Sequence, residues 1–210
     1  MNTRKTIKAI FFDIGGVLVR VDSSAAIKKL SSRLKVDETH IRDAMSRDLM
    51  VKYEKGHLDS NQFYENLLIN CASSEKMELS EFKMYWQDVL FPKERMIAFL
   101  DRAIEHLPTW LLSNTNDFHY EILVEKFPFM KKVNGGTYSF MVASMKPESL
   151  IYEQAIRKCG ELPQHILFID DLEENVNAAR SLGLNTILYT NFNAFQAELR
   201  GSYPELGHLL

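Results

Sequence analysis

Residues 7–19 read IKAIFFDIGGVLV, an apolar run that ends at a single carboxylate, Asp13, and then turns through Gly15 and Gly16. The run does not alternate between polar and apolar side chains, which is typical of a parallel strand that is covered on both faces. In an open parallel sheet, ligands bind beyond the carboxyl ends of the strands. The stretch therefore predicts a buried strand that holds Asp13 at a ligand-binding edge, beside a glycine turn whose backbone can approach the ligand closely.

The composition is that of a soluble globular protein with room for one domain and a sizeable insertion. Of 210 residues, 46% are hydrophobic, and 25 basic side chains stand against 28 acidic ones. Without a basic cluster or an apolar run near the ~20 residues of a membrane span, we expect neither a nucleic-acid nor a membrane partner. Cys71 and Cys159 form no metal or redox motif, and the N-terminus does not resemble a signal peptide, so we expect a cytoplasmic protein.

Short apolar runs alternate with helical patterns along most of the chain. Strands are predicted at residues 7–12, 109–112, 166–169 and 186–189, with a weaker candidate at 138–142. Helical stripes separate these runs, and the alternation predicts a parallel α/β sheet. The tail from residue 192 to residue 210 is predicted to be a short helix followed by a loose end.

Residues 22–91 interrupt this alternation with four amphipathic segments that have no strand between them. Asp59 and Gln62 have the spacing of a capping box at the start of the third segment. Four consecutive helices after the first strand predict a small inserted bundle, with hinges near residues 20–22 and 91–93.

Polar residues gather where the predicted strands end. They are Asp13, Ser113, Asn114, Lys146, Asp170 and Asp171. Each has a structural explanation when taken alone, such as a helix cap or a solvated lysine, but together they favour a site at one edge of the sheet. Clustered carboxylates are held ionised by a cation, and oxygen ligands with phosphate suit Mg²⁺. A hydroxyl, a backbone N–H and an ammonium can hold anionic oxygens, so the set fits phosphoryl transfer.

Four segments resemble, in order, the motifs of the haloacid dehalogenase superfamily. They read IFFDIGGVLV, WLLSNTN, MKPESLIYEQAI and ILFIDDLEENVNAA. The resemblance covers nearly the whole chain. It implies a doubly wound, Rossmann-like α/β core made of residues 1–20 and 92–210, with a four-helix cap inserted at residues 21–91.

The resemblance also implies a metal site. Asp13 is the expected nucleophile, which forms an aspartyl-phosphate and also binds Mg²⁺. The backbone carbonyl of Gly15 and the carboxylate of Asp171 are the other expected ligands, with Asp170 close by or bound through water.

A phosphate site is implied in the same way. Ser113 and the backbone N–H of Asn114 are expected to hold phosphoryl oxygens, and Lys146 is expected to offset the charge of nucleophile and phosphate. Asp13, Ser113 and Lys146 are thus the predicted catalytic residues. The predicted reaction is Mg²⁺-dependent hydrolysis of a small phosphorylated metabolite, such as a sugar phosphate.

Gly15 departs from the family pattern. Most phosphatases of the superfamily have an Asp there, which protonates the leaving group and then activates water, and such catalysis is typically worth ~10²–10⁴-fold. A branch of the family with glycine at this place includes sugar-1-phosphate phosphatases, which favours the phosphatase. A metal-independent 2-haloacid dehalogenase also lacks this acid, but Asp170 and Asp171 stand against it. The third alternative is a non-catalytic protein that binds phosphate or Mg²⁺.

Several residues are candidates to contact a substrate. Glu54, Gly56 and His57 lie in the segment YEKGHLD, between two predicted cap helices, where a loop can overhang the site. His57 and His119 can each be considered as a replacement for the missing proton donor, although exposed loop histidines are more common than catalytic ones. The oligomeric state is expected to be a monomer or a homodimer.

Overall fold

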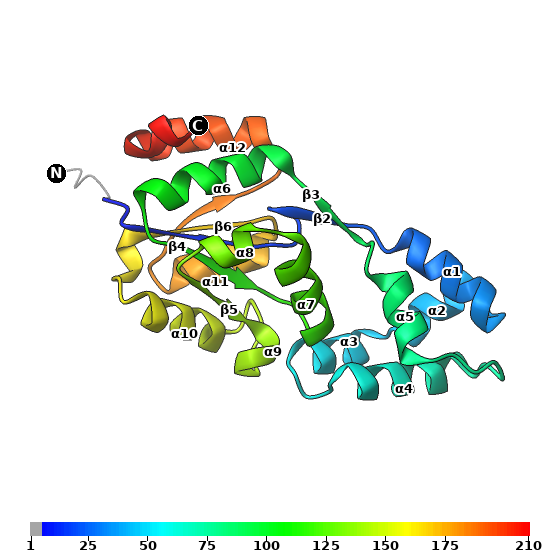
Figure 1. Ribbon diagram of the computed structural model, residues 1–210. Coiled ribbons are helices and arrows are strands. Elements are labelled where there is room, and N and C mark those ends of the chain that lie inside the picture. Colours follow the sequence, from blue (N-terminus) through cyan, green and yellow to red (C-terminus); the bar gives the residue numbers. More distant parts are fainter. Residues whose placement is uncertain (1–5) are drawn as a thin grey trace.

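The central feature of the computed structural model, which describes residues 6–210, is a five-stranded parallel sheet (Figure 1). Its strand order is β5-β4-β1-β6-β7. The strands are β1 Ala9–Phe12, β4 Thr109–Ser113, β5 Gly135–Tyr138, β6 Ile166–Asp170 and β7 Asn185–Leu188. From β1 the chain continues to β4 on one side, and from β6 it continues to β7 on the other. The direction of winding therefore reverses between β1 and β6, where ligands bind in folds of this type.

Helices cover both faces of the sheet, as the doubly wound prediction requires. Successive side chains of β1 point to opposite faces, so Ile10 and Phe12 pack into one apolar cluster and Ala9 and Phe11 into another. The first cluster is closed by α6 Glu94–His106, α7 Asp117–Lys126, α8 Phe129–Lys132 and α12 Phe192–Ser202. The second is closed by α10 Ser149–Cys159 and α11 Glu173–Ser181.

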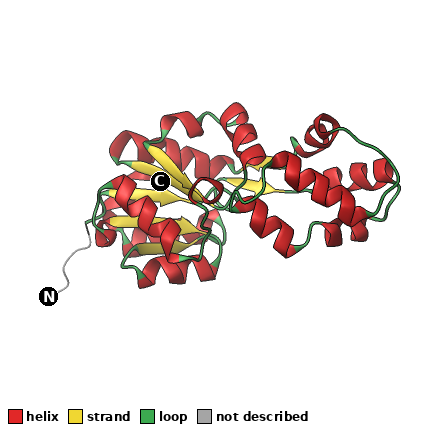
Figure 2. Ribbon diagram, turned by 90° about the horizontal axis from the view of Figure 1, so that it is seen from below, coloured by secondary structure: helices red, strands yellow, loops and turns green. Residues whose placement is uncertain are grey.

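A helical cap projects from the carboxyl end of β1 (Figures 1 and 2). Its helices are α1 Ser24–Leu34, α2 Glu38–Ala44, α3 Arg47–Glu54, α4 Ser60–Cys71 and α5 Leu79–Trp86. The chain enters through β2 Val19–Val21 and leaves through β3 Leu90–Pro92, and these two short strands pair in antiparallel fashion. The predicted hinge segments thus form a ribbon between cap and core. The division into two domains, at residues 20–21 and 91–92, stays a prediction.

The cap has five helices, so the prediction of four was wrong in its second segment. That segment breaks at Ser46, whose side chain accepts a hydrogen bond from the backbone N–H of Leu49 and so begins a new helix. The capping box of Asp59 and Gln62 is confirmed, with both of its reciprocal hydrogen bonds present.

Two further predictions were wrong. The fifth strand occupies Gly135–Tyr138, and the predicted strand at 138–142 is instead the short helix α9 Ser139–Val142. The tail after α12 is not loose, because Pro204–Leu209 forms a 3₁₀ helix; a second short one spans Pro163–His165. Tyr203, Leu206 and Leu209 repeat every three residues, which is the 3₁₀ period, and all three are buried in the core. No helix among residues 6–210 is both long and apolar enough to cross a membrane.

Candidate active site

The side chain of Lys146 joins three of the predicted segments at the point where the winding reverses. Its ammonium lies 2.9 Å from Asp13 Oδ1, just after β1, and 2.6 Å from Asp170 Oδ2, at the end of β6. It also donates to the backbone carbonyl of Leu112 in β4, at 3.0 Å. Lys146 is only 2% exposed, and an ammonium has three protons to donate. The structure therefore fully satisfies this buried cation with two carboxylates and one carbonyl.

Asp170 is held in place by its own neighbours. Its Oδ1 accepts hydrogen bonds from the backbone N–H of Leu172 at 2.8 Å and from Asn175 Nδ2 at 3.0 Å. Its Oδ2 is the atom that contacts Lys146. Both oxygens of this fully buried carboxylate thus already have protein partners.

Asp171 differs from Asp170 because its carboxylate is available to bind a ligand. Oxygens of Asp13, Asp170 and Asp171 lie within 4.8 Å of one another. Among residues 6–210, no side-chain hydrogen bond or ion pair is formed by Asp171. A Cβ atom on Gly16 would lie 2.0 Å from Asp171 Oδ2, and Gly16 has a φ of +77°. The Asp171 carboxylate therefore needs a glycine at position 16 to approach the turn after β1.

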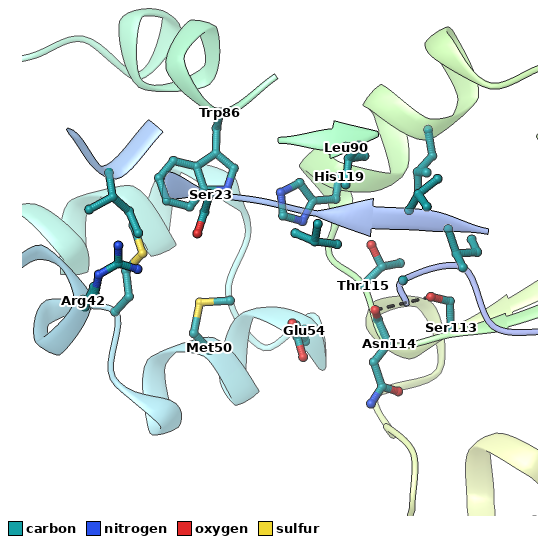
Figure 3. A pocket seen from close by; sticks show the side chains of 17 residues that line it. Ser23, Arg42, Met50, Glu54, Trp86, Leu90, Ser113, Asn114, Thr115 and His119 are labelled. Atoms are coloured by element: carbon teal, nitrogen blue, oxygen red, sulfur yellow. Dashed lines mark hydrogen bonds between the residues drawn. The ribbon is translucent and has the colours of Figure 1, made fainter. Parts of the chain in front are cut away.

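Asn114 ties the loop after β4 to the segment that carries Lys146. Its side-chain amide donates to the carbonyl of Lys146 at 2.9 Å and accepts from the N–H of Lys146 at 2.8 Å. Ser113 is buried at the end of β4, and its hydroxyl makes one long hydrogen bond, 3.4 Å, to the Asn114 carbonyl (Figure 3). The Asn114 side chain is thus a structural clamp, whereas the roles predicted for the Ser113 hydroxyl and the Asn114 N–H toward phosphate stay predictions.

The charges of the cluster are unbalanced. Burial, and to a lesser extent the charge of Asp170, raise the pKa of Asp13 to about 7 against the opposing effect of Lys146. Burial and Asp170 also raise the pKa of Asp171. Burial alone would lower the pKa of Lys146, but the two adjacent carboxylates outweigh it and keep the ammonium protonated. Three carboxylates around one ammonium leave an excess of negative charge that a divalent cation would offset.

A cavity of about 450 Å³ lies between the core and the cap, beside this cluster (Figure 3). Gly15, Ser113 and Asn114 line it on the core side, and Met50 and Trp86 are among its cap residues. Of the residues predicted to act on substrate, Ser113 and Asn114 thus line the cavity next to the charged cluster.

There is space beside the backbone of Gly15, in the wall of this cavity, for a side chain. A Cβ on Gly15 would have Val21 Cγ2, at 3.9 Å, as its nearest neighbour, which is ordinary van der Waals contact. The missing acid is therefore not excluded by crowding, because the backbone at residue 15 has room for a side chain.

Glu54 and His119 line the cavity, whereas His57 is exposed and is not part of its wall. His119 Nδ1 is 3.2 Å from Asn116 Nδ2, and its Nε2 is buried without a hydrogen-bond partner among the described residues. Burial lowers the pKa of His119 to about 4, so the ring is neutral near pH 7. An amide N–H at Nδ1 leaves the proton on Nε2, which makes His119 a hydrogen-bond donor within the wall.

Two residues of the site escaped sequence reasoning. Asn175 supports Asp170, and its place in the segment DDLEEN was a signal that could have identified it. Lys93, which follows β3, donates to the carbonyl of Gly16 and stacks over the ring of Tyr189. No local pattern marks Lys93, because the length of the cap separates it from Gly16 in the sequence.

A family model for haloacid dehalogenase-like hydrolases matches residues 7–183. The chain belongs to this family, which confirms the resemblance seen in its four motifs.

Two proteins named as phosphatases are among the relatives of this chain. The chain is 26% identical to a D-ribitol-5-phosphate phosphatase of Bacteroides thetaiotaomicron, over 92% of this chain and 97% of that protein. It is 24% identical to a sesquiterpene phosphatase of Aspergillus oryzae, over 93% and 96% of the two chains. A haloacid dehalogenase-family enzyme of B. thetaiotaomicron, solved with magnesium and inorganic phosphate, superposes with a TM-score of 0.75 at 25% identity, covering 86% of this chain and 93% of that one.

Proposed function

We propose that the protein is a Mg²⁺-dependent phosphatase that hydrolyses a small phosphorylated metabolite through an aspartyl-phosphate on Asp13. The observation that carries this proposal is the cluster of three carboxylates, Asp13, Asp170 and Asp171, of which the first two pair with the buried ammonium of Lys146. The place of this cluster at the switch point, beside a cavity, adds support. The two phosphatases among the relatives, and the neighbouring structure with magnesium and phosphate, agree with this reading.

The donor set fits magnesium. All three acidic groups offer oxygen ligands, and Mg²⁺ prefers a few carboxylates together with waters and substrate phosphate. Asp13 and Asp171 are the direct ligands in our proposal, with the carbonyl of Gly15, because both oxygens of Asp170 already have protein partners. When bound, the cation offsets the negative charge that the carboxylates and the phosphoryl oxygens bring together.

The protein groups act on phosphate in two steps. The Asp13 carboxylate attacks phosphorus, the bond to the leaving-group oxygen breaks, and water later hydrolyses the aspartyl-phosphate. Lys146 holds Asp13 oriented and stabilises charge on the transferred group. The Ser113 hydroxyl and the backbone N–H of Asn114 hold phosphoryl oxygens from the end of β4.

The relatives suggest which esters to test. Relatives that act on D-ribitol 5-phosphate and on sesquiterpene phosphates differ widely in leaving group. A sugar or polyol phosphate remains our first candidate, and an isoprenyl monophosphate is the apolar comparison. We further propose a cytoplasmic monomer or homodimer, which light scattering after size-exclusion chromatography can test for its oligomeric state.

The deciding experiment measures phosphate release from a panel of sugar, polyol and isoprenyl phosphates, with and without Mg²⁺. We expect release that depends on Mg²⁺ and that Asp13→Asn reduces by more than ~10³-fold, because the nucleophile is lost. Chloride release from 2-chloropropionate without metal would instead establish the dehalogenase. Phosphate or Mg²⁺ binding without turnover of any ester would establish the non-catalytic alternative.

A further inference from the structure

One carboxylate faces the catalytic edge from the cap. Glu54 is the last residue of α3 and lines the same cavity as Gly15, Ser113 and Asn114. Figure 3 shows its side chain on the cap side of the cavity, across from Ser113 and Asn114. An acidic side chain therefore borders the space that a side chain at position 15 would enter.

The residues that follow Glu54 are fixed to the core. Lys55 forms an ion pair with Glu148, two residues after Lys146. A Cβ on Gly56 would lie 2.2 Å from the carbonyl oxygen of Phe140 in α9, and the φ of Gly56 is +68°, so the backbone is seated there with no room for a side chain.

A third contact with the core lies at the end of this segment, residues 55–60. The Ser60 hydroxyl, at the start of α4, donates to Asp117 Oδ1 at 2.7 Å, and the Ser60 backbone N–H reaches Asp117 Oδ2 at 3.1 Å. Asp117 begins α7 in the core. Residues 55–60 are thus held to the core at three points, and Glu54 is presented to the cavity by a segment with a fixed position.

The surroundings of Glu54 suit a group that gives and takes a proton. Burial raises its pKa, and the positive charge of Lys146 opposes that effect. Within residues 6–210 its side chain has no hydrogen-bond or ion-pair partner. The other ionisable groups of the cavity are Arg42, which lies 3.8 Å from Glu38, and the neutral His119.

We propose that Glu54 is the general acid and general base of the reaction, replacing from the cap the side chain that Gly15 lacks. This proposal rests on the phosphatase function proposed above. As Asp13 forms its bond to phosphorus, the leaving-group oxygen keeps the electron pair of the broken bond and takes the proton of the Glu54 carboxyl. In the second step the Glu54 carboxylate takes a proton from water, whose oxygen bonds to phosphorus as the bond to Asp13 breaks.

His119 does not fit this role. Its ring is neutral near pH 7, and an amide N–H of Asn116 occupies Nδ1. Its Nε2 proton is suited to donating a hydrogen bond to a polar atom of the leaving group, without transfer. Glu54 is the remaining cavity group that can be protonated before bond cleavage and ionised after it.

The test compares Glu54→Gln with wild type on two kinds of ester. p-Nitrophenyl phosphate has a leaving group that departs without protonation, whereas an alkyl phosphate requires protonation. We expect Glu54→Gln to lower kcat by ~10²–10³-fold on the alkyl ester and by less than ~10-fold on the first step with p-nitrophenyl phosphate, measured as the burst of p-nitrophenol. Asp48→Asn, an exposed acid on the same helix, serves as the matched control and should change neither rate.

A second readout does not depend on turnover. If Glu54 activates water, the aspartyl-phosphate must persist in Glu54→Gln, and acid quenching should trap a larger labelled fraction of protein than in wild type. Gly15→Asp in the same background should restore alkyl-ester hydrolysis, because position 15 has room for the side chain. In the wild-type background, Gly15→Asp should raise the rate of alkyl-ester hydrolysis much less.

The outcomes separate the two proposals. Equal losses on both esters, with no extra labelled protein, would assign Glu54 to substrate binding and overturn its role in proton transfer. A wild-type protein that neither releases phosphate nor becomes labelled would overturn the phosphatase itself. Glu54→Gln keeps the shape of the side chain, and its thermal unfolding midpoint should match that of wild type.

Discussion

The charged cluster of the core and the cavity beside it differ in how their polar groups are paired. In the charged cluster, which we call the phosphate side, Lys146 has three acceptors and both oxygens of Asp170 have donors. Among the described residues of this cluster, only the Asp171 carboxylate and the buried Asn175 Oδ1 are left without a side-chain partner. On the leaving-group side, Glu54 and His119 Nε2 have no partner among the described residues. His119 Nε2 is a buried polar atom without a partner, and such an atom marks a place where a ligand is expected to provide one.

This difference separates the groups whose positions the protein itself fixes from the groups whose partners a substrate is expected to provide. The phosphate side is preorganised, as electrostatic stabilisation of a transferred group requires. The leaving-group side combines the open position at Gly15 with a carboxylate brought from the cap. The comparison predicts that changes on the phosphate side affect folding and every substrate, whereas changes on the other side discriminate among substrates.

The largest expected effect is that of Lys146→Met. Removing the ammonium leaves Asp13 and Asp170 buried without their shared partner, which should lower the free energy of unfolding by about 3–5 kcal/mol. Urea denaturation without Mg²⁺ measures this loss, and added Mg²⁺ should recover part of it.

The matched control for that change is Lys52→Met, which removes an exposed lysine that pairs with Asp48 on α3. Such surface pairs are worth roughly 0–1 kcal/mol, so its unfolding curve should nearly coincide with that of wild type. Equal losses for the two variants would contradict the view that the phosphate side is held by its buried ion pairs.

Neighbouring glycines give the second test. Gly16→Ala places a Cβ against Asp171 and strains a residue whose φ is +77°, so we expect Mg²⁺ affinity to fall by ~10–100-fold. Gly15→Ala adds a Cβ in open space and should change Mg²⁺ affinity by no more than ~3-fold, since no ligand has to move. Isothermal titration with Mg²⁺ compares the variants, and similar losses in both would refute the packing argument.

A pH dependence of stability should come from His119. Its pKa is lowered to about 4 in the folded protein, whereas an unfolded histidine titrates near its ordinary 6.5. The unfolded chain therefore binds more protons between these values, and stability falls as the pH drops through that range. The loss should reach about 2 kcal/mol at pH 5.

Urea denaturation at pH 7.5 and pH 5 measures this effect in wild type and His119→Gln. The raised pKa of Asp13 acts with the opposite sign in both proteins, so the difference between them isolates the histidine. His57→Gln, at an exposed position, should behave as wild type does. An unchanged pH dependence in His119→Gln would mean that the ring is hydrated in the folded state.

The sequence could predict that the residues of the charged cluster lie close together, because most of them stand at strand ends. Asp13, Ser113 and Asp170 each follow or close an apolar run, and parallel strands bring such ends to one edge whatever the loops do. The family prediction that these segments carried is confirmed. The assignment of individual metal and phosphate ligands stays a prediction, because no contact with either ligand tests it.

The other side could not be predicted in the same way. Glu54 was only one of several substrate-contact candidates in the segment YEKGHLD, and Lys93 was not a candidate at all. Both reach the site through the cap and its ribbon, so their positions depend on how the five helices pack. Ser46 illustrates the same limit, since one side-chain hydrogen bond divides a continuous apolar stripe into two helices. Tertiary contacts, such as that of Gly56 with Phe140, are invisible to periodicity.

The smallest expected effect on stability concerns the ion pair that docks the cap. Lys55 and Glu148 are partly exposed, so a double-mutant cycle with Lys55→Ala and Glu148→Gln should give a coupling of only about 0.5 kcal/mol in unfolding. Lys55 directly follows Glu54, and Glu148 lies two residues after Lys146, so loss of the pair should loosen the segment that presents Glu54. We therefore expect kcat on alkyl phosphates to fall several-fold, about 3–10-fold, while the burst of p-nitrophenol is unchanged. If stability and both rates change in parallel, the pair only holds the fold together; if the alkyl rate alone falls, docking of the cap is part of what positions the acid.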